Sequence, residues 1–199
     1  MTSSGVAQIE LLLHFFDVCT NQVLYSRQVY PKMAFKLVSC YGNVPVYQVQ
    51  DPEVRSFINE GLTGLKTMLL EEPHVKVTTF EVVLLDEKGT VLESYNFGMP
   101  IGDVTKREPQ KAKSTFRGIL LQLASRMSDL PPLSEPTDDG DLSFTFRLET
   151  QNEQELQSLQ WFEVTAPDST AENPKPTSVV PVAKGDQNCL LMDVEIMLN

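Results

Sequence analysis

The stretch that decides the fold is LYSRQVYPKMAF, residues 24–35, at the end of a strongly apolar segment. Residues 6–26 have apolar side chains on more than one side of a helical projection, which predicts a helix at the centre of the core. Pro31 ends this pattern, because its ring removes a backbone donor and restricts the residue before it. Arg27 and Lys32 are expected to snorkel at the helix exit, with their charged ends in water.

The remaining patterns predict an α+β fold in which three helices pack on one antiparallel sheet. Two further segments have helical spacing, 52–70 and 109–130, and each has proline at one of its limits. The strand candidates are a hairpin (75–85 and 90–97 around the turn DEKG), an alternating strand (142–149) and two short apolar runs (178–183 and 189–198). An extended piece is also expected within 42–52.

Composition restricts the function classes. The 199 residues suit one domain, and 27 acidic against 16 basic residues give a net charge of −11. That balance argues against a surface that grips nucleic acid directly. Charged residues interrupt the longest apolar cluster, and MTSSGVAQIE lacks a basic segment, so neither a membrane span nor a secretory signal is expected. The three cysteines have no CxxC spacing, which favours a reducing, intracellular compartment.

No catalytic motif emerges from the sequence. The glycines form no phosphate-binding loop, and no GxSxG or similar turn frames a nucleophile. No pair of Cys or His has the spacing of metal ligands, and His14 is expected to be a buried histidine of the first helix. The sequence therefore predicts a protein that is not an enzyme and that uses no cofactor or metal.

A binding protein is the alternative to an enzyme, and the C-terminal part of the sequence favours it. A connector rich in Pro, Ser, Thr and Asn, residues 166–178, separates the last strand candidates from the rest and is expected to be mobile. A tail of this kind can dock on a sheet edge. Trp161, the one tryptophan, precedes this connector and is either a core aromatic or an anchor for a bound peptide.

Several of these segments resemble the HORMA domain family. They are NQVLYSRQVYPKMAF, YGNVPVYQVQDPEVRSFI, the hairpin VTTFEVVLLDEKGTVLESYNF and FRGILLQLASRM, followed by the C-terminal strand runs. The Tyr-Pro step with Phe35 four residues beyond the proline is the most recognisable part. The resemblance covers nearly the whole chain and implies one HORMA domain, with a core at about 5–150 and a safety-belt region at about 151–199.

The resemblance implies that the belt closes over an extended peptide from a partner, which adds a strand to the sheet. Matching motifs place Phe57 and Trp161, with Phe162 beside it, at peptide-contacting positions. Arg117 matches an arginine that the family uses for pairing between two HORMA domains.

A second partner surface in the family lies on the terminal strands. Aligned without gaps from Pro181, its positions here are Val179, Asp193 and Glu195. An acid at Glu195, where the family has an aromatic residue, departs from the pattern and would change that surface.

Two functions known in the family remain open. The first is the accessory subunit of DNA polymerase zeta, a nuclear protein of translesion synthesis and DNA repair that binds the catalytic subunit through an extended peptide and also meets a translesion scaffold polymerase. The second is a spindle assembly checkpoint protein that binds an activator of the anaphase-promoting complex. The segment 41–58, with its Asn-Val-Pro-Val run and Pro-Glu helix start, favours the polymerase subunit.

Overall fold

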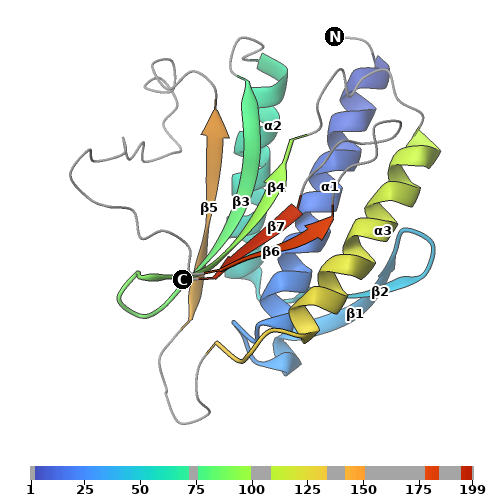
Figure 1. Cartoon of the computed structure of the whole chain (residues 1–199). Helices are drawn as coiled ribbons and strands as arrows, with labels where there is room; N and C mark the ends of the chain where they lie inside the picture. Colours follow the sequence, from blue (N-terminus) through green and yellow to red (C-terminus); the bar gives the residue numbers. More distant parts are fainter. Residues whose placement is uncertain are drawn as a thin grey trace.

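The computed structural model describes residues 3–71, 76–99, 109–133, 142–150, 178–183 and 194–198 (Figure 1). Its elements in chain order are α1 (Ser3–Ser26), a 3-10 turn (Lys32–Ala34), β1 (Phe35–Cys40), β2 (Val44–Val49), α2 (Pro52–Glu71), β3 (Val77–Leu85), β4 (Val91–Gly98), α3 (Pro109–Ser128), β5 (Ser143–Thr150), β6 (Ser178–Ala183) and β7 (Val194–Leu198). The predicted helices, the central hairpin and the strands predicted at 142–149 and 178–183 are confirmed, with small shifts in their bounds. Of the last predicted run, 189–198, the structure shows a strand at Val194–Leu198, and 189–193 lie outside the described residues. The fold is α+β, as expected.

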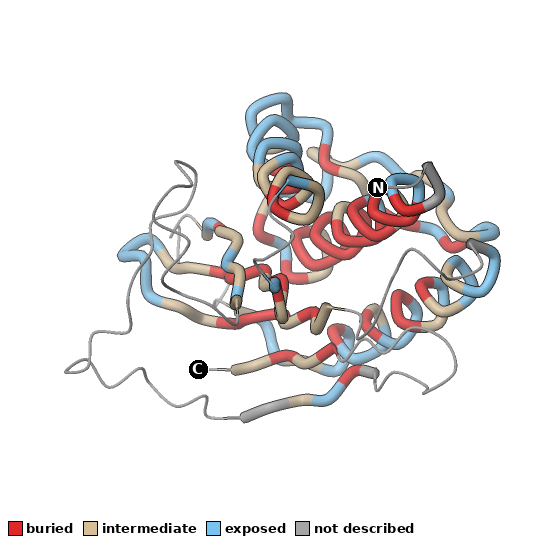
Figure 2. The backbone as a smooth tube through the Cα atoms, turned by 90° about the horizontal axis from the view of Figure 1, so that it is seen from above, coloured by how far each residue is buried: buried red, intermediate tan, exposed pale blue. Residues whose placement is uncertain are grey.

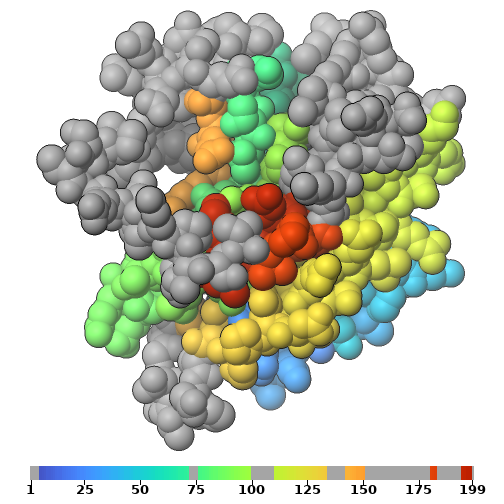
Figure 3. All heavy atoms as spheres, viewed as in Figure 1, coloured from blue at the N-terminus to red at the C-terminus, as the bar shows by residue number. Residues whose placement is uncertain are grey.

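Five strands form one antiparallel sheet in the order β5-β3-β4-β7-β6. In Figure 1 α2 lies behind β3, and α3 lies beside the C-terminal strands. In the space-filling view the atoms of β6 and β7 lie directly against those of α3 (Figure 3). The last strands are therefore part of the main sheet and pack on a helix.

The first helix is central, as its sequence predicts. Figure 2 shows α1 buried along most of its length, because α2, α3 and β2 all pack against it. Phe15 stacks on Phe116 of α3 with ring centroids 4.2 Å apart, and Phe16 stacks on Phe80 of β3 at 4.6 Å. Contacts on several sides explain why this helix needs apolar residues around most of its circumference.

The structure adds a second sheet that the sequence did not predict. The expected extended piece within 42–52 is β2, and it pairs with β1, register Phe35↔Val49 to Cys40↔Val44. The strand β1 was missed because none of its residues is fully buried, so it has no clear alternation. In the turn between them Tyr41, Gly42 and Asn43 all have positive φ, 45°, 79° and 72°. The hairpin lies on the opposite side of α1 from the main sheet.

The expectation for Arg27 was wrong, because its guanidinium is buried and paired instead of snorkelling into water. Its Nε and Nη2 atoms donate to the two carboxylate oxygens of Glu93 at 2.9 and 2.7 Å. Arg27 Nη2 also donates to the carbonyl of Pro131 at 2.6 Å, and the hydroxyl of Tyr95 donates to Glu93 at 2.6 Å. Burial and the adjacent Glu93 carboxylate raise the pKa of Tyr95 well above its usual value.

The expectation for His14 was also wrong. Its side chain is exposed on α1 and lies against the ring of Tyr41, with centroids 5.5 Å apart.

None of the described helices is long and apolar enough to cross a bilayer.

The Arg27–Glu93 pair yields the first prediction. Arg27→Met leaves the Glu93 carboxylate buried without its cation, so it should lower the free energy of unfolding by about 3–5 kcal/mol. The Arg27→Met/Glu93→Gln double variant should be more stable than Arg27→Met alone, because a neutral amide can still accept from Tyr95. Urea denaturation of the wild type, both single variants and the double variant measures this cycle. Additive losses in the double variant would show that the two side chains do not act as a pair.

Candidate functional site

The outer edge of β5 is unpaired within the described part of the chain. β5 pairs with β3 on one side, from Val77↔Thr150 to Leu85↔Ser143, and is the outermost strand of the sheet. Alternate backbone N–H and C=O groups of an outermost strand point away from the sheet and can pair with another extended segment. The opposite outermost strand, β6, is less suited to this, because it contains Pro181 and packs against α3.

An aromatic cluster lies beside this edge, and it consists of Tyr30, Phe57, Phe144 and Phe146. Phe57 stacks on Phe146 with centroids 5.7 Å apart and meets Phe144 edge-on at 5.3 Å. Tyr30 meets Phe144 edge-on at 6.4 Å. Phe57 is 44% exposed even though it touches two rings, so it offers an apolar surface next to the open strand.

Gly61 allows α2 to approach β5 closely. A Cβ atom at Gly61 would lie 2.6 Å from Cδ2 and 2.9 Å from Cε2 of Phe146. No side chain fits there unless the phenyl ring moves. A glycine in the middle of a helix usually costs stability, and here its role is to make room for the ring that supports Phe57.

Burial and hydrogen bonds shape the electrostatics around the edge. Burial raises the pKa of Tyr30, and the negative charge of Asp51 adds to this effect. On the strands, burial raises the pKa of Glu81, which a hydrogen bond with Ser94 and the charge of Arg147 partly offset. The edge thus combines backbone groups that β3 leaves unpaired with an aromatic surface at Phe57.

This arrangement suits the capture of an extended peptide. Backbone hydrogen bonds to β5 would bind the peptide irrespective of its sequence, and the aromatic cluster would select apolar side chains on one face of it. Within the described residues, no group of three or more His, Cys, Asp or Glu side chains could hold a metal ion. The fold and its outermost strand define the class: an α+β domain with a sheet edge at which an extended peptide could add a strand.

Of the three residues predicted to contact the peptide, the structure describes one. Phe57 lies in the aromatic cluster beside β5. Trp161 and Phe162 lie outside the described residues, as do the connector 166–177 and the belt before β6, so their roles stay predictions.

The other predicted surfaces lie elsewhere on the molecule. Arg117 is exposed on α3, and its Nη1 atom lies 3.7 Å from where a Cβ would be at Gly42, beside the turn between β1 and β2. Glu195 is on β7 opposite Asn96 of β4, and Val179 is on β6 opposite Met197. Asp193 lies outside the described residues. The described ones among these positions lie on α3, β6 and β7, whereas the aromatic cluster lies on α2, β5 and the exit of α1.

Three members of the aromatic cluster, Tyr30, Phe144 and Phe146, were not predicted from the sequence as site residues, and neither was Gly61. The alternation of Phe144 and Phe146 predicted a half-buried strand, but it did not show that this strand is outermost. The available signal was Phe57, a large apolar residue at a position of α2 that faces away from the helix's buried residues.

Comparison with known proteins identifies the family. No family model matches the chain. The spindle checkpoint protein MAD2 of Arabidopsis thaliana is 31% identical over 142 residues, which is 68% of this chain and 66% of that relative. The DNA polymerase zeta subunit 2 of Drosophila melanogaster is 22% identical over 203 residues, 94% of this chain and 96% of the relative.

Solved structures support the same assignment at the level of the fold. A chain of the mitotic checkpoint complex superposes with a TM-score of 0.70 at 18% identity and covers 97% of this chain and 99% of its own length. HTP-1 of C. elegans, bound to the HIM-3 closure motif, gives a TM-score of 0.66 at 12% identity over 96% of this chain and 91% of its own. The chain belongs to the HORMA domain family of MAD2-like proteins.

The close contact at Gly61 yields the second prediction. Gly61→Ala should displace the ring of Phe146 and lower the free energy of unfolding by about 1–3 kcal/mol, despite the higher helix propensity of alanine. Gly118→Ala is the matched control in α3, since a Cβ at that position would have nothing within 4 Å, and it should stabilise the protein by about 0.5–1 kcal/mol. Thermal and urea unfolding measure both variants. Equal effects at the two glycines would contradict the close packing of Phe146.

Proposed function

We propose that this chain is a non-catalytic adaptor that captures an extended partner segment along the free edge of β5. The observation that carries the proposal is the open edge with the exposed ring of Phe57 beside it. Solved structures with this fold support the proposal, since HTP-2 and HTP-1 of C. elegans are each seen bound to the HIM-3 closure motif. Phe57 from α2 and, from the belt, Trp161 and Phe162 contact the captured segment in this proposal.

The chain connectivity supports a belt at about 151–199. β5 is at one side of the sheet and β6 at the other, so the connection between them must join opposite sides. With β6 and β7 on the β4 side, none of the described strands pairs with the outer edge of β5, which supports its use by a partner strand. In this proposal the whole chain, 1–199, is a single HORMA domain.

The partner that we propose is the catalytic subunit of DNA polymerase zeta, in translesion synthesis and DNA repair in the nucleus. The support is the alignment with the Drosophila subunit over 94% of this chain, against 68% for the Arabidopsis checkpoint protein. The higher identity of the checkpoint protein, 31% against 22%, favours the second candidate, spindle checkpoint signalling through an activator of the anaphase-promoting complex. A translesion scaffold polymerase would dock on Val179, Asp193 and Glu195.

Purification of the tagged chain from cells separates these candidates. A B-family polymerase catalytic subunit among the bound proteins would support the first function, and an activator of the anaphase-promoting complex would support the second. Recovery of neither, under conditions in which the chain remains folded, would contradict both.

Phe57 provides the test of the edge itself. Phe57→Ala should raise the dissociation rate of the captured segment by about tenfold or more, because an exposed aromatic anchor is lost while strand pairing remains. Leu121→Ala is the control, an equally exposed apolar residue (48%) on α3, and it should leave binding unchanged. Surface plasmon resonance with the partner segment measures both rates. Unchanged binding in Phe57→Ala would exclude the aromatic cluster as the contact surface.

Pairing between two HORMA domains is proposed to use α3. This helix contains Lys111, Lys113, Arg117 and Arg126 and no acidic residue, in a chain whose net charge is −11. Arg117→Ala should shift a dimer toward monomer, because it removes an exposed cation beside the open surface at Gly118. Light scattering of the wild type, Arg117→Ala and the control Arg126→Ala measures the change. If the wild type is a dimer and Arg117→Ala has the same mass, the proposed role of Arg117 in pairing is contradicted.

A further inference from the structure

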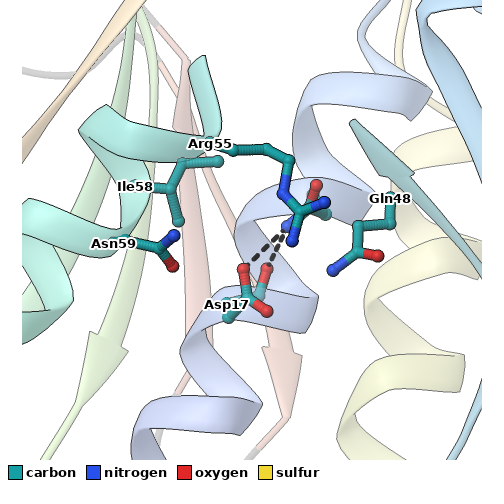
Figure 4. Close-up of a pocket in the computed structure, with 6 residues that line it drawn as sticks. Asp17, Gln48, Arg55, Ile58 and Asn59 are labelled. Carbon is teal, nitrogen blue, oxygen red and sulfur yellow. Dashed lines mark hydrogen bonds between the residues drawn. The ribbon is translucent and has the colours of Figure 1, made fainter. Parts of the chain in front are cut away.

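A polar pocket lies between α1, β2 and α2, on a different face of α2 from the aromatic cluster. It is lined by Asp17, Asn21, Gln48, Arg55, Ile58 and Asn59, and its volume is about 40 Å³ (Figure 4). Phe57 and Gly61 of the same helix contact β5 instead. The pocket is therefore separate from the proposed peptide edge.

The floor of the pocket is fixed by hydrogen bonds. Asn21 Nδ2 donates to the backbone carbonyl of Asp17 and to its carboxylate Oδ1, both at 2.9 Å. Asn21 Oδ1 accepts from the backbone N–H of Val49 at 2.8 Å. The buried amide of Asn21 is thus held at both ends, and its Nδ2 atom orients the Asp17 carboxylate.

Opposite charges face this pocket without forming an ion pair. Figure 4 shows the guanidinium of Arg55 above the carboxylate of Asp17, with the side chains of Asn59 and Gln48 on either side. Asp17 and Arg55 form no ion pair with an N···O distance within 4.0 Å, unlike Arg27–Glu93 and Lys66–Glu10 in the described part of the chain. In the same part of the chain, no protein group hydrogen-bonds to the side chains of Arg55 or Asn59.

Partial burial of the Asp17 carboxylate disfavours its charged form, and no ion pair in the described part of the chain offsets this. Burial raises its pKa, and His14, Arg55 and the hydrogen bond from Asn21 only partly offset this. The charge of Asp17 in turn raises the pKa of its neighbours Cys19, Cys40 and Tyr41, in addition to the larger effect of their own burial. An asparagine at this position would accept the same bond from Asn21 without the charge, and perturbed carboxylates in clefts are often functional.

We propose that this pocket binds a neutral polar group of carboxamide size, which donates to Asp17 and accepts from Arg55. The volume of about 40 Å³ corresponds to about three water molecules, and a carboxamide has three heavy atoms. An anion could accept from Arg55 but has no hydrogen to donate to the Asp17 carboxylate, and a cation could donate to Asp17 but has no acceptor for Arg55, so each ion leaves one charged group unsatisfied. A carboxamide has a donor and an acceptor on one small plane and satisfies both residues.

Two sources can supply this group: the side chain of Asn or Gln in a docked protein segment, or a free small amide. N-acetyl-asparagine N-methylamide and N-acetyl-alanine N-methylamide distinguish them. Tighter binding of the asparagine compound than of both acetamide and the alanine compound identifies a protein side chain as the source. Binding of acetamide that is as tight as that of the asparagine compound identifies a free amide.

Three probes of the same shape and different charge test the proposal: acetate, acetamide and acetamidinium. The readout is the NMR shift of the Asn21 side-chain amide and the Val49 backbone amide in the full chain. Acetamide is expected to bind in the millimolar range and at least about fivefold more tightly than either ion, since each ion leaves Asp17 or Arg55 without a hydrogen-bond partner.

Charge-removing variants should reorder the probes. Asp17→Asn is expected to bind acetate more tightly than acetamidinium, because only Arg55 remains charged. Arg55→Gln should show the reverse order. Absence of shifts at Asn21 and Val49 with acetamide would overturn the proposal, and so would an unchanged order of the three probes in both variants.

Discussion

The buried pair of Arg27 and Glu93 is the interaction on which the arrangement of helices and sheet depends. Two charges removed from water are tolerated only when their hydrogen bonds are complete. Here the carboxylate accepts from Arg27 and from the Tyr95 hydroxyl, and the guanidinium also donates to the carbonyl of Pro131. These groups come from the exit of α1, the middle of β4 and the chain just after α3. These bonds join the three elements to one another, and a different arrangement that separated them would leave a buried charge without its partners.

The same strand connects this pair to the candidate site. β4 carries Glu93 and pairs on its other side with β7, with Glu93 opposite Leu198 and Tyr95 opposite Ile196. Val194 and Ile196 of β7 are buried in the core, so the C-terminal strands are held on this side of the sheet. With β7 beside β4 and β6 beyond β7, β5 is the outermost of the described strands on the other side. The open edge that we propose as the binding site thus follows from where the last strands lie.

Sequence patterns predicted the elements well, because the spacing of apolar residues within one segment shows whether it is a helix or a strand and which of its faces is buried. They did not predict contacts between distant residues. Nothing near Arg27 identifies Glu93, 66 positions away, as its partner, so its guanidinium was expected in water. Alternation placed Phe144 and Phe146 on a half-buried strand, but their contact with Phe57 depends on strand order. The strand β1 was missed for a related reason, since it packs too little of its surface to leave a periodic signal.

The helix α2 carries residues of both proposed sites and holds them in fixed positions. Its buried face packs into the core through Ile58, Leu62, Leu65 and Met68. On one side Phe57 meets β5, and on another Arg55 borders the polar pocket. Side chains on a helix that is anchored in this way are already positioned before a ligand arrives, which lowers the entropic cost of binding. The two sites share no lining side chain, and neither requires α2 to move. Their binding free energies should therefore add, so occupation of the pocket would leave the affinity of the β5 edge unchanged.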